Sequence, residues 1–223
     1  MNVTAAIKAR TSVRAFKDTP VSEALVKEIL EIARFSPSGG NLQPWHVYAI
    51  AGTPLREFKA MIAARMATNP MGEGAELEIY PKDLKEPYRT RRYTVGEGLY
   101  ATLGIPREDK LSRLGQMAKN FDFFGAPVAL FFAIDRQMGL NQWAHLGMFM
   151  QSIMLLAQER GLATCAQEAW ALWNGPIRTF LQIPDELRLY CGMALGHADD
   201  AAKVNTFRAE RAPLEEFAVL KGF

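Results

Sequence analysis

Two arginine clusters near opposite ends of the chain carry the clearest chemical signal. Arg10, Ser12 and Arg14 lie in the stretch KARTSVRAF, and Arg208 and Arg211 lie in VNTFRAERAPLEEF. Guanidinium groups donate forked, charge-assisted hydrogen bonds, which suit a phosphate dianion. If the fold brings the two clusters together, they form a phosphate site. If it does not, each cluster is an ordinary solvated basic face.

A second candidate site is the long connection RFSPSGGNLQPWHVYAIAG, residues 34–52. A turn between a helix and a strand needs only Gly or Pro, whereas Ser38, Asn41 and Gln43 add hydrogen-bonding groups that a ligand can use. Taken by itself, however, this stretch is more typical of a surface loop without a binding role.

Aromatic residues and one carboxylate complete the set of candidates. Several aromatic side chains have the shape to stack on a planar ligand, although most such residues belong to a core or a surface. Glu168, in TCAQEAW, has the chemistry of a general acid, but a lone loop carboxylate more often anchors the backbone or is solvated. The residues therefore indicate a ligand with a phosphate and an aromatic ring. The stacking candidates are Trp170, Trp173, Tyr80, Tyr88 and Tyr93.

The sequence lacks the patterns that define several other kinds of site. It contains no GxGxxG, GxxxxGK[ST] or GxSxG stretch, so neither a standard nucleotide loop nor a hydrolase elbow is expected. The histidines, His46, His145 and His197, have no metal-ligand spacing, and we expect no metal. Cys165 and Cys191 form no CxxC pair and favour a reduced, cytoplasmic setting.

Composition excludes some partners. The formal net charge is only +2, so no global field attracts nucleic acid or an anionic membrane. The longest uncharged run, residues 137–158, contains too many polar side chains for a lipid-facing span and predicts a central soluble helix. With 223 residues and 49% hydrophobic content, the chain is long enough for one large domain over residues 1–223.

Apolar periodicity predicts alternating helices and strands. Ser22 is the expected cap of a helix whose buried face holds Leu25, Ile29, Ile32 and Ala33. Pro54 opens another helix. We expect strands over 46–52, 126–134, around 165 and over 188–196, and helices over 4–9, 80–93, 106–118, 138–160 and 176–182.

Two segments fall outside this regular pattern. Residues 69–120 have no dominant period, and residues 82–119 hold nine basic side chains against five acidic ones, a local net charge of +4. We expect an inserted, lid-like cover there, with a simple surface excursion as the equally favoured alternative. The tail, residues 203–223, carries Phe207, Phe217 and Phe223 and needs a surface on which to dock.

Five stretches taken together resemble one known family. ARTSVRAF, SPSGGNLQPW, FFGAPVALFF, GLATCAQEAW and VNTFRAERAPLEEF, in this order over nearly the whole chain, are similar to the FMN-dependent nitroreductase family. The resemblance implies an α+β fold with a mixed sheet surrounded by helices. It also implies an intertwined homodimer, embraced by the 203–223 tail, with FMN at each of two subunit interfaces and NADH or NADPH as the electron donor.

The resemblance also implies roles for individual residues, all of them in cofactor binding. Arg10 and Ser12 match phosphate-binding positions completed by Arg208 and Arg211, and Arg14 matches a basic position near the flavin N1/O2 edge. The backbone amides that face flavin N5 and O4 in the family match those of Gln167, Glu168 and Ala169, so Glu168 is not assigned as an acid. Flavin N5 carries the chemistry, and no catalytic side chain is implied. The remaining matches lie in the loop that reaches the flavin of the partner subunit and are Pro37, Ser38, Gly39 and Asn41.

Two positions depart from the family pattern. The family often has a second consecutive arginine where this chain has Thr11, and often proline where it has Ala166. Neither change removes a phosphate donor.

The implied function is ping-pong reduction. NAD(P)H delivers hydride to FMN and leaves, and the reduced flavin then passes electrons in pairs to a small aromatic acceptor, a nitroaromatic compound or a quinone. A flavin-dependent reductive dehalogenase of the same fold is the alternative, with Glu86 or Glu97 as clamps for an amino-acid zwitterion. A non-enzymatic nucleic-acid binder using Arg89, Arg91 and Arg92 is less favoured, because acidic residues are interspersed there.

Overall fold

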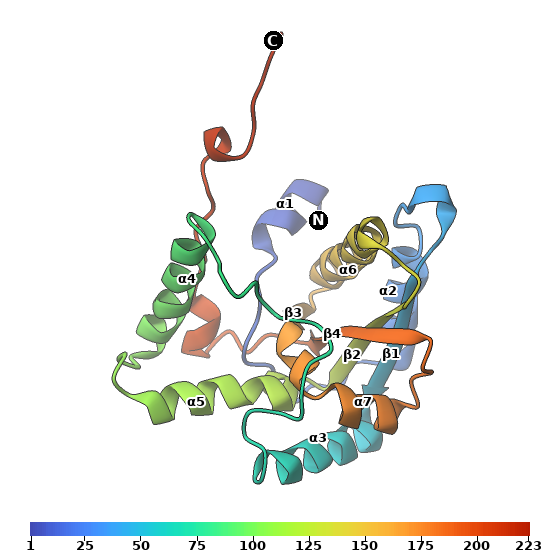
Figure 1. The fold of residues 1–223 in the computed structure, drawn as a ribbon, viewed down its shortest axis with the longest axis vertical. Helices are drawn as coiled ribbons and strands as arrows, with labels where there is room; N and C mark the ends of the chain where they lie inside the picture. The colour runs from blue at the N-terminus through green and yellow to red at the C-terminus, as the bar shows by residue number, and fades with distance from the viewer.

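A four-stranded sheet forms the centre of the molecule, which the computed structural model describes over residues 1–223 (Figure 1). The strands β1 (Trp45–Ala51), β2 (Val128–Asp135), β4 (Leu187–Gly196) and β3 (Ala163–Gln167) lie side by side in that order. All neighbouring strands pair antiparallel. Parallel pairing enters the expected mixed sheet only as an isolated bridge between Ser12 and Thr164, at the β3 edge.

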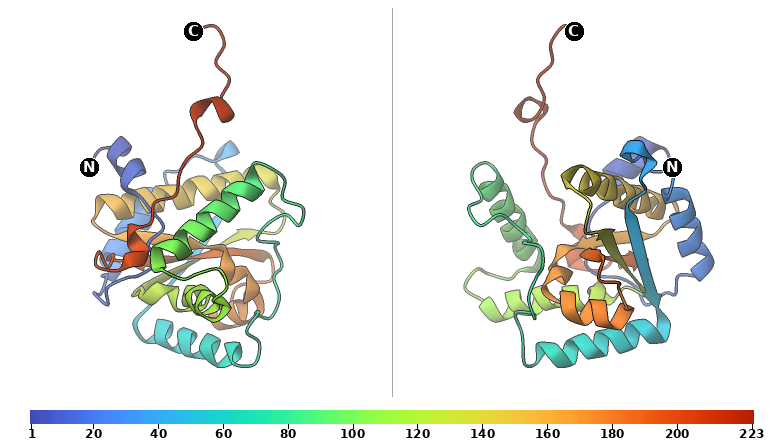
Figure 2. Two further views of the ribbon diagram at one scale, coloured as in Figure 1. Left: turned by 90° about the vertical axis from the view of Figure 1, so that its left-hand side faces the viewer. Right: turned by 45° about the vertical axis from the view of Figure 1, so that its right-hand side comes forward.

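The continuous apolar run in β2 is explained by burial on both faces. Successive side chains of a strand point to opposite sides. Phe131 accordingly packs with α3 (Gly52–Met66) and α7 (Asn174–Leu181), whereas Leu130 and Phe132 pack with α2 (Glu23–Ala33) and α6 (Leu140–Glu159). The sheet is therefore the middle layer between two helical layers (Figures 1 and 2). None of the helices combines the length and apolar composition needed to cross a membrane.

Helix α2 begins where the sequence predicts. The Ser22 hydroxyl oxygen accepts a hydrogen bond from the Leu25 backbone N–H at 3.2 Å, and so caps the helix. Its buried stripe is centred on Val26, Ile29 and Ala33. Ile32 is 41% exposed, so its expected burial was wrong. At about 3.6 residues per turn, Ile32 lies at the edge of the buried stripe, beside Ile29 and on the side away from Val26.

The two helices of the 69–120 segment differ in how well they match their predicted positions. Helix α5 (Lys110–Ala118) falls within 106–118, and the Asp109 carboxylate caps it by accepting from the Ser112 N–H at 3.0 Å. The other helix was predicted over 80–93 but lies further along the chain, since α4 spans Tyr88–Leu103. Pro87 is tolerated only at a helix start, and the helix then continues through two glycines that the sequence pattern treats as breakers.

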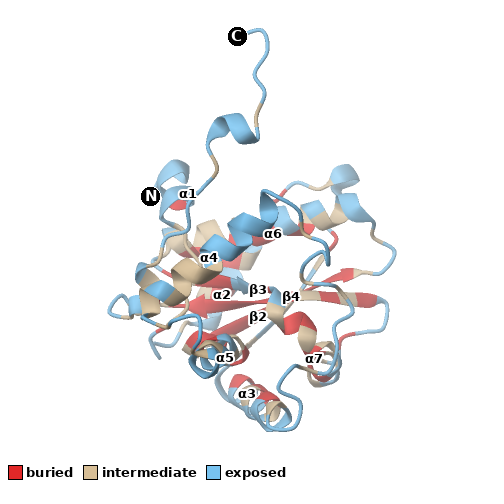
Figure 3. Cartoon of the chain, turned by 60° about the vertical axis from the view of Figure 1, so that its left-hand side comes forward, coloured by how far each residue is buried: buried red, intermediate tan, exposed pale blue.

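Helix α4 is separated from the core. None of its residues is buried, as Figure 3 shows by the absence of buried colouring along it. Its link to α5 is an ion pair in which Arg113 donates to the Glu97 carboxylate at 2.6 and 2.8 Å. Packing against the sheet therefore does not hold α4 in place, and its position depends on contacts with α5 and with the tail.

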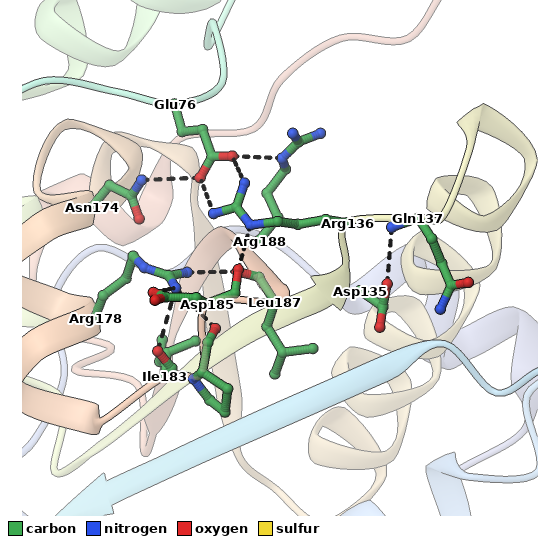
Figure 4. Close-up of polar contacts among 11 residues, drawn as sticks. Glu76, Asp135, Arg136, Gln137, Asn174, Arg178, Ile183, Asp185, Leu187 and Arg188 are labelled. Atoms are coloured by element: carbon green, nitrogen blue, oxygen red, sulfur yellow. Dashed lines mark hydrogen bonds and ion pairs between the residues drawn. The ribbon is translucent and has the colours of Figure 1, made fainter.

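The start of the same segment is pinned to the sheet by Glu76. Its carboxylate accepts hydrogen bonds from Arg136 at the end of β2, from Arg188 on β4 at 2.8 Å and from Asn174 on α7 at 3.3 Å (Figure 4). Burial alone raises the pKa of this carboxyl, but the two guanidinium groups outweigh it and lower the pKa to about 2. Glu76 therefore stays ionised and holds three elements together.

The C-terminal tail leaves the body of the molecule. After η4 (Lys203–Thr206) the chain runs past α4, forms the short turn η5 (Leu214–Glu216) and projects outward to Phe223 (Figures 1 and 2). Phe217, Leu220 and Phe223 are exposed. These apolar side chains have no surface to pack on within one chain.

Candidate functional site

The two arginine clusters lie in one pocket, although they are almost 200 residues apart in sequence. The pocket has a volume of about 510 Å³. Arg10, Ser12 and Arg14 line one side, and Arg208 and Arg211 line the other. Helix α4 contributes Val95, and α1 (Val3–Ala9) contributes Ile7 and Lys8. The fold therefore brings the two arginine clusters together, which was the condition for the phosphate site predicted from the sequence.

The 10–14 segment owes its shape to the sheet edge. The Val13 N–H donates to the Thr164 carbonyl of β3 at 3.0 Å, and the Val13 side chain is buried. In an extended segment alternate residues share a side, so Arg10, Ser12 and Arg14 face away from the core together. The spacing of two residues therefore places all three side chains in the pocket.

The other wall of the pocket is attached through Asn205. Its Oδ1 accepts from the Arg14 N–H at 2.8 Å, and its Nδ2 donates to the Ala15 carbonyl at 2.8 Å. Sequence reasoning missed this residue. The available signal was its place three residues before Arg208, but no local pattern identifies an asparagine whose partners lie at the other end of the chain.

The pocket carries positive charge that no carboxylate neutralises. The guanidinium groups donate to backbone carbonyl oxygens: Arg14 to Ser12 at 3.2 Å, Arg208 to Asn205 at 2.7 Å and Arg211 to Ala209 at 2.8 Å. Burial, followed by the charge of Arg211, lowers the pKa of Arg10. Because like charges face one another there, a bound anion relieves their repulsion, and these donors fit a phosphate group.

Both cysteines are buried and pack in the hydrophobic core. Burial raises the pKa of the Cys165 thiol to about 11, although Arg14 and Ser12 act in the opposite direction. Burial also raises the pKa of Cys191 well above its usual range. Both thiols are therefore protonated at neutral pH and do not act as nucleophiles.

The loop predicted at Gln167, Glu168 and Ala169 begins at the C-terminal end of β3. Gln167 is buried, and its Nε2 donates to the Asn120 carbonyl at 2.7 Å. Glu168 is exposed, and its carboxylate accepts from the Tyr190 hydroxyl at 3.1 Å. Gln167 lies three residues after Thr164 on the strand, a distance of about 10 Å. One strand therefore connects the basic pocket with the 167–169 loop.

The loop of Pro37, Ser38, Gly39 and Asn41 does not join this pocket in one chain, because none of its residues lines it. The loop has its own internal structure. The Gln43 N–H donates to Ser38 Oγ at 3.0 Å, and the Gly39 N–H donates to His145 Nε2 on α6 at 3.3 Å. Its predicted contact with a flavin of a partner subunit remains a prediction.

Helix α4 leans on the tail that carries Arg208 and Arg211. A Cβ atom added at Gly98 would lie 2.8 Å from the Phe207 ring, so only glycine allows this approach. Arg91 forms an ion pair with Glu216 further along the tail. The glycine that seemed to argue against a helix is therefore the point at which α4 contacts the wall of the pocket.

Four tyrosines of the 69–120 segment, among them the three expected to stack on a ligand, are stacked with arginines of their own segment. Arg92 lies 3.9 Å from the centre of the Tyr80 ring, and Arg113 lies 4.3 Å from that of Tyr100. Tyr88 and Tyr93 face Arg91 and Arg107 in the same way. Trp170 and Trp173 are fully buried in the core and take no part in the pocket.

Comparison with known proteins agrees with this combination of fold and basic pocket. The model of the nitroreductase family matches residues 7–197. The chain is 38% identical to a 4-nitrobenzoate reductase of Pseudomonas putida, over 98% of this chain and 95% of that protein. It is also 38% identical to a nitrobenzene nitroreductase of Ectopseudomonas oleovorans, over 95% of this chain and 93% of that protein.

Solved structures agree as well. The FMN- and NADPH-dependent nitroreductase NfnB of Sphigopyxis sp. strain HMH matches with a TM-score of 0.96 and 45% identity, over 100% of both chains. The FMN-dependent NfnB of Mycobacterium smegmatis, solved with NADPH, matches with a TM-score of 0.92 and 27% identity, over 98% of this chain and 97% of that one.

Fold and pocket together define a class of α+β proteins with a basic pocket beside the edge strand of an antiparallel sheet. Within that class, the chain belongs to the nitroreductase family. The family expected from the five sequence stretches is thereby confirmed.

Proposed function

We propose that this chain is an NAD(P)H-dependent FMN enzyme that reduces nitroaromatic compounds. The observation that carries the proposal is the convergence of four arginines, unneutralised by carboxylates, in a pocket that β3 connects to the 167–169 loop. The relatives that the chain matches over nearly its whole length are nitroaromatic reductases.

In this proposal the two walls of the pocket hold the FMN phosphate. Arg10 and Ser12 donate from one wall, and Arg208 and Arg211 donate from the other. Arg14, on the same side as Ser12, places positive charge near the N1/O2 edge of the ring. The backbone of Gln167, Glu168 and Ala169 faces N5 and O4, while Pro37, Ser38, Gly39 and Asn41 come from the second subunit.

FMN, when bound, supplies the redox chemistry by accepting a hydride at N5 and returning electrons in pairs. The chain contributes positioning and electrostatics. A positive charge from Arg14 favours the electron-rich, reduced ring, and the carboxylate of Glu168 is held aside by Tyr190, so that the loop backbone is presented to the ligand. The donor and the acceptor use the same site in turn, in a ping-pong order, and quinones are further acceptors.

The function is tested with the purified chain. We expect a yellow protein that oxidises NADPH or NADH in the presence of 4-nitrobenzoate, nitrobenzene or a quinone, with parallel double-reciprocal plots for donor and acceptor. Intersecting plots contradict the ping-pong order alone. A colourless protein that cannot be reconstituted with FMN contradicts the whole proposal.

No observation favours the dehalogenase alternative. Its candidate clamp residues are already engaged: Glu97 with Arg113 at 2.6 Å, and Glu86 with Arg89 at 2.8 Å. Hydrogen bonds from Arg113 lower the pKa of Glu97 below its usual range. A panel that includes halotyrosines separates the two activities.

We further propose that the enzyme is a homodimer held by the 203–223 tail. Deleting residues 213–223 is expected to yield monomers that lose FMN, because the exposed Phe217, Leu220 and Phe223 need a second copy to pack on. Sedimentation and flavin absorbance are measured together. Leu140→Ala, which removes an equally exposed apolar side chain outside the tail, is the control. A truncated monomer that retains flavin contradicts the model.

The 69–120 segment is proposed as a lid for the acceptor, since α4 reaches the pocket through Val95. Replacing Arg91 and Arg92 with alanine is expected to raise the KM for 4-nitrobenzoate about 3- to 10-fold, because each exposed charge contributes up to about 1 kcal/mol. The KM for uncharged nitrobenzene stays unchanged, and so does the FMN content, because the contact of Gly98 with Phe207 and the hydrogen bonds of Asn205 still hold the base of the tail when the Arg91–Glu216 ion pair is lost. Arg56→Ala, an exposed arginine on α3 outside the segment, is the control. If the variant treats both acceptors as the parent does, the segment is only a surface excursion.

A further inference from the structure

The side chain of Asn205 joins the two walls of the basic pocket. Its Oδ1 accepts from the Arg14 N–H, and its Nδ2 donates to the carbonyls of Ala15 and Asp199, each at 2.8 Å. Of the two terminal atoms of an asparagine side chain, only the oxygen can accept from an N–H and only the nitrogen can donate to two carbonyls, so these partners define the orientation of the side chain. No other residue type of this size offers the same combination.

The backbone of Asn205 completes the connection. Its carbonyl oxygen accepts a hydrogen bond from the Arg208 guanidinium at 2.7 Å. One residue thus contacts the 10–14 wall through its side chain and the arginine of the opposite wall through its backbone. The neighbouring Val204 is buried, which anchors the short η4 turn against the body.

The arrangement matters because the two walls carry charges of the same sign. Arg10 and Arg211 line the same pocket from opposite walls, and burial, followed by the charge of Arg211, lowers the pKa of Arg10, so the two walls repel one another. The tail from Phe207 onward is largely exposed, and it is restrained by contacts with α4 at Phe207 and Glu216. Without a link at its base, the tail is free to move away from the 10–14 segment.

We propose that Asn205 is a positioning residue, which sets the separation of the two arginine walls so that both bind a single phosphate group. The proposal rests on the proposed function, because it assigns that phosphate to FMN. Asn205 itself need not touch the ligand. Its side chain holds only the backbone of the 10–14 wall and of Asp199, and its carbonyl holds the Arg208 guanidinium, so its effect falls on the spacing between the phosphate donors of the two walls.

A comparison of FMN with riboflavin isolates this effect, since the two differ only in the phosphate. The Kd of each is measured on flavin-free, full-length protein by fluorescence quenching, and the ratio of the riboflavin Kd to the FMN Kd reports the contribution of the phosphate. Asn205→Ala is expected to lower this ratio about 10-fold, the change that follows from misplacing one charge-assisted hydrogen bond. The Kd of riboflavin stays within about 2-fold of the parent value, which is the usual scatter of a neutral substitution.

Two further variants complete the design. Asn205→Asp keeps an acceptor for the Arg14 N–H but places an oxygen against two carbonyls, so the ratio falls here too even if the alanine variant folds poorly. Asn174→Ala is the matched control, because Asn174 also has a hydrogen-bonded side chain, donated to Glu76 far from the pocket. Combining Asn205→Ala with Arg208→Ala should lower the ratio no further than Arg208→Ala alone, since the two act as a unit.

Each outcome has a distinct meaning. An unchanged ratio in folded Asn205 variants overturns the positioning role, and so does an equal loss for FMN and riboflavin, which indicates a general structural effect. If the parent protein itself does not prefer FMN to riboflavin, the phosphate site of the proposed function is wrong. That result is separate from the behaviour of Asn205.

Discussion

Replacing Arg208 with alanine is expected to weaken FMN binding about 10-fold or more, and Arg10→Ala should do the same from the other wall of the pocket. A hydrogen bond between a guanidinium group and a phosphate contributes roughly 1.5 to 3 kcal/mol, which corresponds to this change in Kd. Because neither guanidinium is paired with a carboxylate, removing one breaks no ion pair within the chain. The Kd is measured by titrating flavin-free protein with FMN.

Arg56→Ala is the control for this experiment. Arg56 is an exposed arginine on α3 that donates only to Thr53, and its loss should leave FMN affinity unchanged. Raising the salt concentration should weaken FMN binding in the parent more than in either pocket variant, because the parent has more charge to screen. Unchanged affinity in both Arg10→Ala and Arg208→Ala would remove the phosphate assignment.

Gly192→Ala is expected to destabilise the protein by about 3 kcal/mol, at the upper end of overpacking effects. A Cβ atom at Gly192 would lie 2.4 Å from Cδ1 of Trp170. Trp170 is fully buried and has no room to withdraw, because the rings of Phe58, Phe123 and Phe131 surround it at centroid distances of 5.4, 4.4 and 5.6 Å. Urea unfolding of the flavin-free protein measures the loss.

The same substitution should also reduce FMN affinity. Trp170 Nε1 donates to the Gln167 side chain, so a displaced indole disturbs the 167–169 loop. Gly147→Ala on α6 is the control, because a Cβ atom there meets nothing within 4 Å. Alanine is the better helix former, so this variant should be neutral or slightly stabilised. If Gly192→Ala unfolds at the parent urea concentration, the close packing around Trp170 is not as the structure describes it.

Local sequence determined those features that depend on neighbouring residues. Ser22 capped α2 and Asp109 capped α5 because a cap satisfies backbone N–H groups only a few residues away. The buried run of β2 was evident from its composition. The two-residue spacing of Arg10, Ser12 and Arg14 is also local, but it gives them a shared side only because pairing with Thr164 of β3 keeps the segment extended.

Tertiary structure alone decided which distant residues meet. The sequence named both arginine clusters, but only the sheet edge and the Asn205 contacts, across 190 residues, bring them to one pocket. Gly96 and Gly98 lower the helix propensity of their segment, yet α4 runs through both. At Gly98 the absence of a side chain leaves room for the Phe207 ring. Propensity reports the cost of a residue in its own element, whereas the free space and the hydrogen-bond partners around that residue come from elements far away in the chain.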